Sequence, residues 1–167
     1  MYQRILVPTD GSELAAVAAN AAISFAQSCG GDIVALSVAY PEPVLLSAEG
    51  AIAAGTELGA DVLLEHAQKY VGQVADAARA AGVACTALTA YGYSPADEII
   101  EVAKRQHCDL IFIASHGRRG LSRLIAGSVT QRVLAYAPVP VMVYRAHAAH
   151  SRGRLAQEVP AAARPPG

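Results

Sequence analysis

The chain has 167 residues, a formal net charge of −1, 53% hydrophobic residues and 16% charged residues. This length and composition predict one compact domain and exclude an intrinsically disordered protein. The near-zero net charge excludes a nucleic-acid-binding protein that depends on bulk positive charge. No apolar run reaches the roughly 18 residues of a membrane helix, and no signal-peptide core follows Met1. We therefore expect a cytoplasmic protein with no membrane partner.

The first third of the chain alternates strand-like and helical patterns. Residues 4–10 form a short β-favouring run that ends in a proline and an Asp-Gly turn pair. A serine N-cap then opens an alanine-rich helix over residues 12–28, which two glycines at 30–31 close. The continuous apolar run at 32–40 predicts a strand buried on both faces. Residues 41–57 contain prolines and glycines without a period, which indicates a long connection.

The rest of the chain continues the alternation. The predicted elements are helices at 58–81, 94–107 and 128–137 and strands at 83–91, 109–115 and 139–145. This order predicts an α/β fold with one open parallel sheet and helices on both faces. Pro140 places the last strand at an edge, and its apolar sequence predicts a homodimer that pairs residues 139–145 of two copies. Residues 146–167 have the composition of a flexible tail, which leaves a domain of residues 1–145.

The distribution of charge and of potential metal ligands adds one positive indication. Between Asp109 and Glu158 the chain has seven arginines and no carboxylate, which indicates a local anion site, although a solvated basic face gives the same count. The five histidines and the cysteines show no spacing typical of a metal site. We expect Cys29, Cys85 and Cys108 to be reduced thiols that pack as small hydrophobic side chains.

Two loops can meet at the carboxyl edge of this sheet, where open α/β sheets bind ligands. "PTDGS" (8–12) follows the first strand, and "ASHGRRGLSRLIAGS" (114–128) follows the fourth. Gly117 lets the backbone approach an anion closely, and Gly127-Ser128 begins a helix whose unpaired N–H groups favour negative charge. The arginines that could add charge-assisted contacts are Arg118, Arg119 and Arg123. An ordinary strand-to-helix connection explains the same residues, and the chain lacks both GxGxxG and GxxxxGK[ST].

The same loops contain the three residue types of a Ser-His-Asp triad. Ser115 and His116 are adjacent, and Asp10 lies in the other loop. Adjacent residues on a strand point in different directions, so we expect no triad and predict no catalytic residue.

The element order, "ILVPTDGS" and "SHGRRGLSRLIAGSVTQRVLAYAPVPVMVYR" together resemble the universal stress protein family over residues 2–145. The resemblance implies a Rossmann-like sheet in the order 3-2-1-4-5, similar to the adenine nucleotide α hydrolases, and dimers through the last strand. It also implies an ATP-binding and a non-binding branch. The pattern of the binding branch is G-x(2)-G-x(9)-G-[ST]. Gly117 matches its second glycine, Gly127-Ser128 match its end, and Ala114 replaces its first glycine.

By position, the resemblance implies a pocket for ATP, with AMP or ADP as alternatives and Mg²⁺ as a possible companion ion. Asp10 would meet the ribose or, only through the bound nucleotide, the metal ion. The residues placed beside adenine are Pro8, Thr9 and Val38. The residues placed beside the ribose and the phosphates are Ala114, His116, Gly117, Arg118, Gly127, Ser128 and Val129.

Three functions stay open. The first is a homodimeric, ATP-binding stress-response protein in which the nucleotide orders residues 115–126 and alters a surface for an unknown protein partner. The second is a dimeric interaction module of the same fold that binds no nucleotide, which Ala114 favours. The third is an ATPase, which ranks last because the chain has no Walker lysine and no evident base beside the phosphates, so that at most slow hydrolysis is expected.

Overall fold

The computed structural model describes residues 2–41, 59–117 and 126–145. The strands are β1 (Arg4–Pro8), β2 (Asp32–Ala39), β3 (Cys85–Tyr91), β4 (Leu110–Ala114) and β5 (Val141–Tyr144). The helices are α1 (Glu13–Cys29), α2 (Ala60–Ala80), α3 (Pro95–Arg105) and α4 (Ser128–Tyr136). The predicted order of strands and helices is confirmed. Most of the predicted 41–57 connection, Arg118 with most of the 115–126 loop, and the predicted tail lie outside the described residues.

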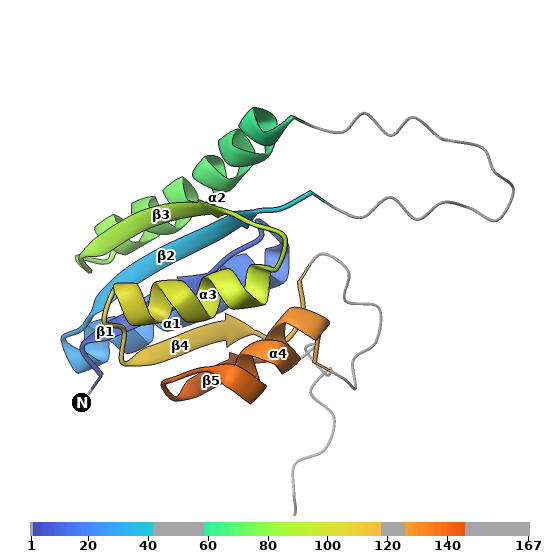
Figure 1. The fold of residues 1–167 in the computed structure, drawn as a ribbon. Helices are drawn as coiled ribbons and strands as arrows, with labels where there is room; N and C mark the ends of the chain where they lie inside the picture. The colour runs from blue at the N-terminus through green and yellow to red at the C-terminus, as the bar shows by residue number, and fades with distance from the viewer. Residues whose placement is uncertain (1, 42–58, 118–125, 146–167) are drawn as a thin grey trace, which may run out of the picture.

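The strands form one parallel sheet in the order β3-β2-β1-β4-β5 (Figure 1), which confirms the predicted order 3-2-1-4-5. From β1 the chain adds β2 and β3 on one side, and it then returns to add β4 and β5 on the other. Connections after β1 and β4 therefore run to opposite sides of the sheet. This reversal creates a topological switch point at the carboxyl ends of these two central strands, where α/β sheets bind ligands.

Each face of the sheet buries its own set of apolar side chains. In Figure 1, α3 and α4 lie in front of the sheet and α1 and α2 lie behind it. The strand residues on the α1–α2 side are Ile5, Val7, Ile33, Ala35, Leu110 and Phe112. Those on the α3–α4 side are Leu6, Val34, Leu36, Ile111 and Ile113. The central strands are thus buried on both faces, which explains their continuous apolar sequences.

Local backbone signals end α1 where the sequence predicts, and a local helix-ending hydrogen bond after α2 delays the start of β3. Ser12 caps α1 by accepting the Ala15 N–H at 3.2 Å, and Gly30 ends it in the left-handed conformation (φ 68°). Strand β3 begins two residues later than predicted, because the Val83 N–H donates to an α2 carbonyl at 2.9 Å. Pro140 precedes β5 rather than lying in it, and its carbonyl accepts the Ile111 N–H at 3.0 Å.

The cysteines behave as the sequence predicts. All three are free thiols, with Cys108 buried and Cys29 and Cys85 half-buried. Burial raises the pKa of the Cys108 thiol to about 11, so this side chain stays protonated and packs as an apolar group. Within the described residues no helix is long and apolar enough to cross a membrane.

Candidate functional site

The loops that follow β1 and β4 leave the sheet side by side. The two strands pair directly, with Ile5 opposite Leu110. A Cβ built on Gly117 would overlap the Oδ2 atom of Asp10, so the carboxylate lies against the Gly117 backbone. The structure therefore brings Asp10 and Gly117 together at the switch point, as the topology predicts.

Backbone hydrogen bonds fix the loop that carries Asp10. The Thr9 N–H donates to the Leu36 carbonyl of β2 at 2.8 Å, and the Gly11 N–H donates to Thr9 Oγ1 at 3.3 Å. The Ser12 N–H donates to Asp10 Oδ1 at 3.0 Å, which is an Asx turn. One carboxylate oxygen thus orders the loop, while the other lies beside Gly117.

Gly11 is the residue at which this loop turns. Its φ of +78° lies in the left-handed region, and a Cβ built on it would overlap the ring of Tyr70 from α2. Both the backbone angle and the ring contact require glycine here. The sequence places Tyr70 on the apolar face of a helix, but the period of that helix gives no signal that the ring meets this loop.

Strand β4 ends at Ala114, which is 6% exposed. Among the described non-glycine residues only His107 has a positive φ, so Ala114 adopts an ordinary strand conformation that places no demand for glycine. Alternation along the strand puts its Cβ on the same face as Phe112 and opposite to Ile113. The methyl group therefore points to the α1 side of the sheet, away from α4.

Ser115 and His116 follow the end of β4 and contact each other. Ser115 Oγ and His116 Nδ1 lie 3.1 Å apart. The expectation that these side chains point in different directions is wrong, because the strand ends at Ala114 and its alternation does not extend to them. Ser115 is only 4% exposed, so its hydroxyl is poorly placed to attack a substrate.

Helix α4 begins beside this segment. A Cβ built on its N-cap residue, Gly127, would lie 3.7 Å from the His116 Cα. The Gly127 N–H already donates to the Ser115 carbonyl at 2.8 Å. No described residue accepts a hydrogen bond from the amides of Ser128, Val129 or Thr130, and no side chain caps the helix. The amides of Ser128, which is exposed, and of Val129, which is half-buried, are therefore the donors available to a ligand, rather than the amide of Gly127.

Thr130 is a buried polar residue that is not among the predicted site residues. Its side chain is 3% exposed, and its Oγ1 donates to the Ala114 carbonyl at 3.0 Å. A threonine three residues after a helix N-cap is a recognisable pattern, but only the structure shows that its partner lies at the end of β4.

The other predicted site residues lie at the same edge of the sheet. Pro8 is the last residue of β1, and Val38 is near the end of β2, opposite Ala90 of β3. Val129 packs against the core on the α3–α4 side. Every predicted site residue except Arg118, which lies outside the described residues, is thus at the carboxyl edge or at the start of α4. The described residues contain no group of three potential metal ligands. Asp10 is therefore the one predicted site residue that could contact a metal ion bound with the nucleotide.

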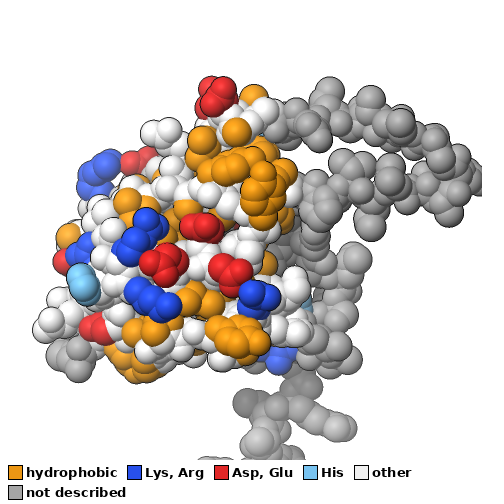
Figure 2. Space-filling model, in the orientation of Figure 1, with side chains coloured by type: hydrophobic (Ala, Val, Ile, Leu, Met, Phe, Trp, Pro, Cys, Tyr) orange, Lys and Arg blue, Asp and Glu red, His pale blue; other side chains and the backbone are white. Residues whose placement is uncertain are grey.

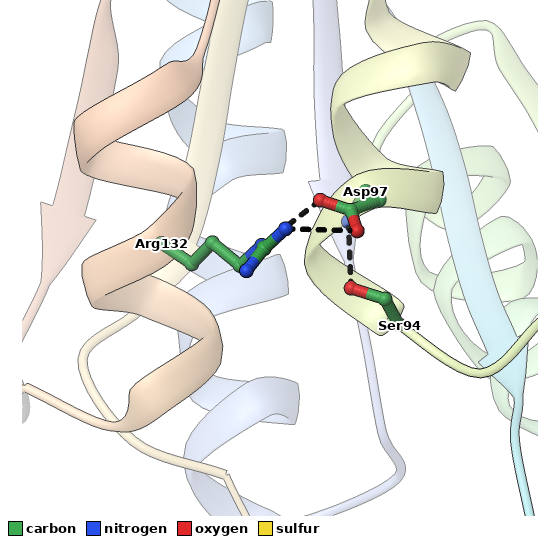
Figure 3. Close-up of polar contacts among 3 residues, drawn as sticks. All are labelled: Ser94, Asp97 and Arg132. Atoms are coloured by element: carbon green, nitrogen blue, oxygen red, sulfur yellow. Dashed lines mark hydrogen bonds and ion pairs between the residues drawn. The ribbon is translucent and has the colours of Figure 1, made fainter.

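Arg132 does not contribute to an anion site. Its Nε and Nη2 donate to the two carboxylate oxygens of Asp97, at 2.9 and 3.1 Å, across the contact between α4 and α3 (Figure 3). This pairing, together with a hydrogen bond to Ser94, lowers the pKa of Asp97. Figure 2 shows basic and acidic side chains interspersed on this face of the molecule. For Arg132, the solvated-face interpretation of the arginine-rich segment is therefore correct.

The fold and the edge loops define a doubly wound α/β domain with an exposed helix start at its switch point. The model of the universal stress protein family matches residues 1–145, and the chain belongs to this family. The universal stress protein MJ0531 of Methanocaldococcus jannaschii is 35% identical over 146 residues, which cover 87% of this chain and 83% of that protein.

Solved structures of this family share the fold. The structure of MJ0577 from M. jannaschii has a TM-score of 0.68 and 27% identity, over 86% of this chain and 95% of that one. A universal stress protein in complex with cAMP has a TM-score of 0.62 and 21% identity, over 86% and 96% of the two chains. The Archaeoglobus fulgidus protein in complex with dAMP has a TM-score of 0.60 and 20% identity, over 85% and 97%. At these identities the two complexes show the fold alone for this chain, while both ligands are adenine nucleotides.

Proposed function

We propose that this protein binds an adenine nucleotide, ATP above all, and acts in the cytoplasm as a homodimeric regulatory protein of the stress response. The observation that carries the proposal is the start of α4. Ser128, Val129 and Thr130 offer successive amides without an acceptor among the described residues, next to the loop that holds Asp10 against Gly117. The cAMP and dAMP complexes of two relatives support an adenine nucleotide as the ligand.

The phosphates would occupy the start of α4. The unpaired amides of the first turn and the positive end of the helix dipole both favour a negatively charged group. The hydrogen bond from the Gly127 N–H to the Ser115 carbonyl holds this helix start near Gly117, where the lack of a Cβ leaves room for the Asp10 carboxylate. Ser128 is exposed and Val129 is half-buried, so a ligand can reach the first amides of the helix from solvent.

Asp10 would hold the other end of the ribose-phosphate unit. A carboxylate repels phosphate, but it accepts hydrogen bonds from ribose hydroxyls and ligates hard cations. Mg²⁺ bound together with ATP would neutralise phosphate charge beside this carboxylate. Adenine would then lie against Pro8, Thr9 and Val38, at the ends of β1 and β2.

Ala114 is compatible with this site. An alanine in ordinary strand conformation brings no backbone strain, and its methyl group points to the side of the sheet opposite α4. These observations favour the nucleotide-binding branch of the family over the non-binding alternative.

The dimer would form at the open edge of β5. The Ile111 N–H donates to the Pro140 carbonyl and the Ser115 N–H to the Tyr144 carbonyl. In a parallel pair this alternation turns the backbone groups of Val141 and Val143 toward the open edge. We expect Val143→Pro to remove an outward N–H without breaking a bond to β4 and to yield a monomer in sedimentation velocity. A dimer that survives this substitution would contradict the edge-pairing arrangement.

Equilibrium dialysis with radiolabelled ATP and Mg²⁺ tests nucleotide binding. The wild-type protein should show saturable binding that Asp10→Ala or Gly127→Val removes. Gly127→Ala is the matched control, because its Cβ would meet His116 and Ser115 at 3.7 Å, an ordinary contact, and its φ of −59° suits any residue. If the wild-type protein shows no binding at millimolar ATP, the proposal is wrong and the interaction module is favoured. The melting temperature gives a second test. ATP raises it only by binding the folded protein, so an unchanged melting temperature with ATP would also favour the interaction module.

A further inference from the structure

Thr130 makes a hydrogen bond that does nothing for its own helix. A threonine within a helix ordinarily donates to the carbonyl four residues earlier, and a threonine at an N-cap accepts from the first turn. Thr130 Oγ1 instead donates to the carbonyl of Ala114, 16 residues away, at 3.0 Å. The bond is buried, and it joins the first turn of α4 directly to the last residue of β4.

A second hydrogen bond ties the same two elements together. The Gly127 N–H donates to the Ser115 carbonyl at 2.8 Å. Gly127 precedes Ser128 and Val129, and Thr130 follows them, so the two bonds bracket the open amides on both sides. Two hydrogen bonds therefore set the position of these amides relative to the carboxyl edge of the sheet. One goes to Ala114 at the end of β4, and the other goes to Ser115, the next residue.

We propose that Thr130 is a positioning residue that aims the amides of Ser128 and Val129 at the phosphates of the bound nucleotide. The inference rests on the nucleotide-binding function proposed above. Thr130 does this through its hydroxyl, which holds α4 on the Ala114 carbonyl without touching the ligand. This role depends on the hydroxyl and not on the size of the side chain. Substitutions can therefore separate the effect of the hydrogen bond from the effect of packing.

Two substitutions separate the hydroxyl from the rest of the side chain. Thr130→Val keeps the shape and removes the donor, whereas Thr130→Ser keeps the donor and removes a buried methyl group. Loss of this bond should weaken ATP binding about tenfold in Thr130→Val, the equivalent of one hydrogen bond. Adenosine has no phosphate, so its affinity should not change. Thr130→Ser should restore the ATP affinity even though its melting temperature falls.

The experiment is calorimetric titration of the three proteins with ATP plus Mg²⁺ and with adenosine, well below their melting temperatures. An ATP-specific loss in Thr130→Val that Thr130→Ser restores supports the proposal. Equal losses for ATP and adenosine, or wild-type ATP affinity in Thr130→Val, would overturn it.

A measurement without ligand keeps the inference separate from the proposed function. If the wild-type protein binds neither ATP nor adenosine, the proposed function fails. Amide hydrogen exchange and ¹⁵N-resolved chemical shifts at Ser128 and Val129 then decide whether Thr130 positions them. Changes in Thr130→Val that are absent from Thr130→Ser support positioning, and unchanged amides in Thr130→Val refute it.

Discussion

Ser128→Pro deletes one proposed phosphate donor and nothing else that the described residues use. Ser128 is the first residue of α4, the position at which proline is favoured because its missing N–H has no partner in the helix. The preceding Gly127 has ψ 156°, an extended conformation that suits a following proline. Helix α3 already begins in this way, with Ser94 followed by Pro95.

The expected effects on folding and on binding differ in size. No acceptor among the described residues loses a bond, so stability should change by less than about 1 kcal/mol. A hydrogen bond to a charged group contributes about 1.5–3 kcal/mol, so ATP binding should weaken roughly 10- to 100-fold. Ser128→Ala keeps the amide and removes only the hydroxyl, so its loss should be clearly smaller.

The assay is the ATP dialysis described above, with urea denaturation of each variant. The chain offers a matched control in Ala60→Pro. Its N-cap Gly59 has φ −53° and ψ 151°, nearly the angles of Gly127, and Ala60 is the first residue of a helix outside the proposed site. Ala60→Pro should bind ATP as the wild type does.

Two results would refute the reasoning. Wild-type affinity in Ser128→Pro would mean that the first amide of α4 does not bind phosphate. Equal losses in Ser128→Pro and Ala60→Pro would mean that proline acts through the whole fold and not through the site.

Three further predictions concern stability. Gly11→Ala should destabilise the fold by more than about 1 kcal/mol in urea denaturation, because its φ is +78° and its Cβ meets Tyr70; adding Tyr70→Ala should recover only the steric part. His107→Gly should raise stability by about 0.5–1 kcal/mol in a thermal scan, because His107 ends α3 with a φ of 52°. Arg132 lowers the pKa of Asp97, so the stabilisation is present above the unfolded-state value near 3.8 and disappears as the pH falls through the folded-state value. The difference in melting temperature between wild type and Asp97→Asn should therefore shrink as the pH falls from 7 through the folded-state pKa of Asp97, and it should vanish below that pKa.

The fold follows from the sequence wherever a local signal decides the structure. Ser12 and Gly30 mark the two ends of α1 through their own backbone preferences, and apolar runs identify the strands. The start of β3 differs because the apolar run at 83–91 does not show which of its first residues still belong to the end of α2. The Val83 amide donates to the Ala78 carbonyl, five residues earlier, after Gly82 turns with φ 71°, so Val83 completes the cap of α2 instead of joining β3.

The site is predictable to the level of its loops but not of its individual bonds. Parallel topology alone brings Asp10 near Gly117, because neighbouring strands end at one edge. Two details depend instead on how separate elements pack. The Gly127 amide donates to the Ser115 carbonyl, and the Tyr70 ring lies against Gly11. Strand alternation likewise gives no guide to Ser115 once the strand has ended.

The sequence and the structure lead to different interpretations of Ala114. In the sequence it replaces the first glycine of the implied binding motif, which argues against nucleotide binding. In the structure it contributes a carbonyl to Thr130 and turns its methyl group to the Phe112 side of the sheet, and any residue supplies that carbonyl. Ala114→Gly should therefore change the ATP dissociation constant by less than about twofold, while it lowers stability by about 0.5–1 kcal/mol through added backbone freedom. A large gain in ATP affinity in the dialysis assay would show that the methyl group occupies ligand space.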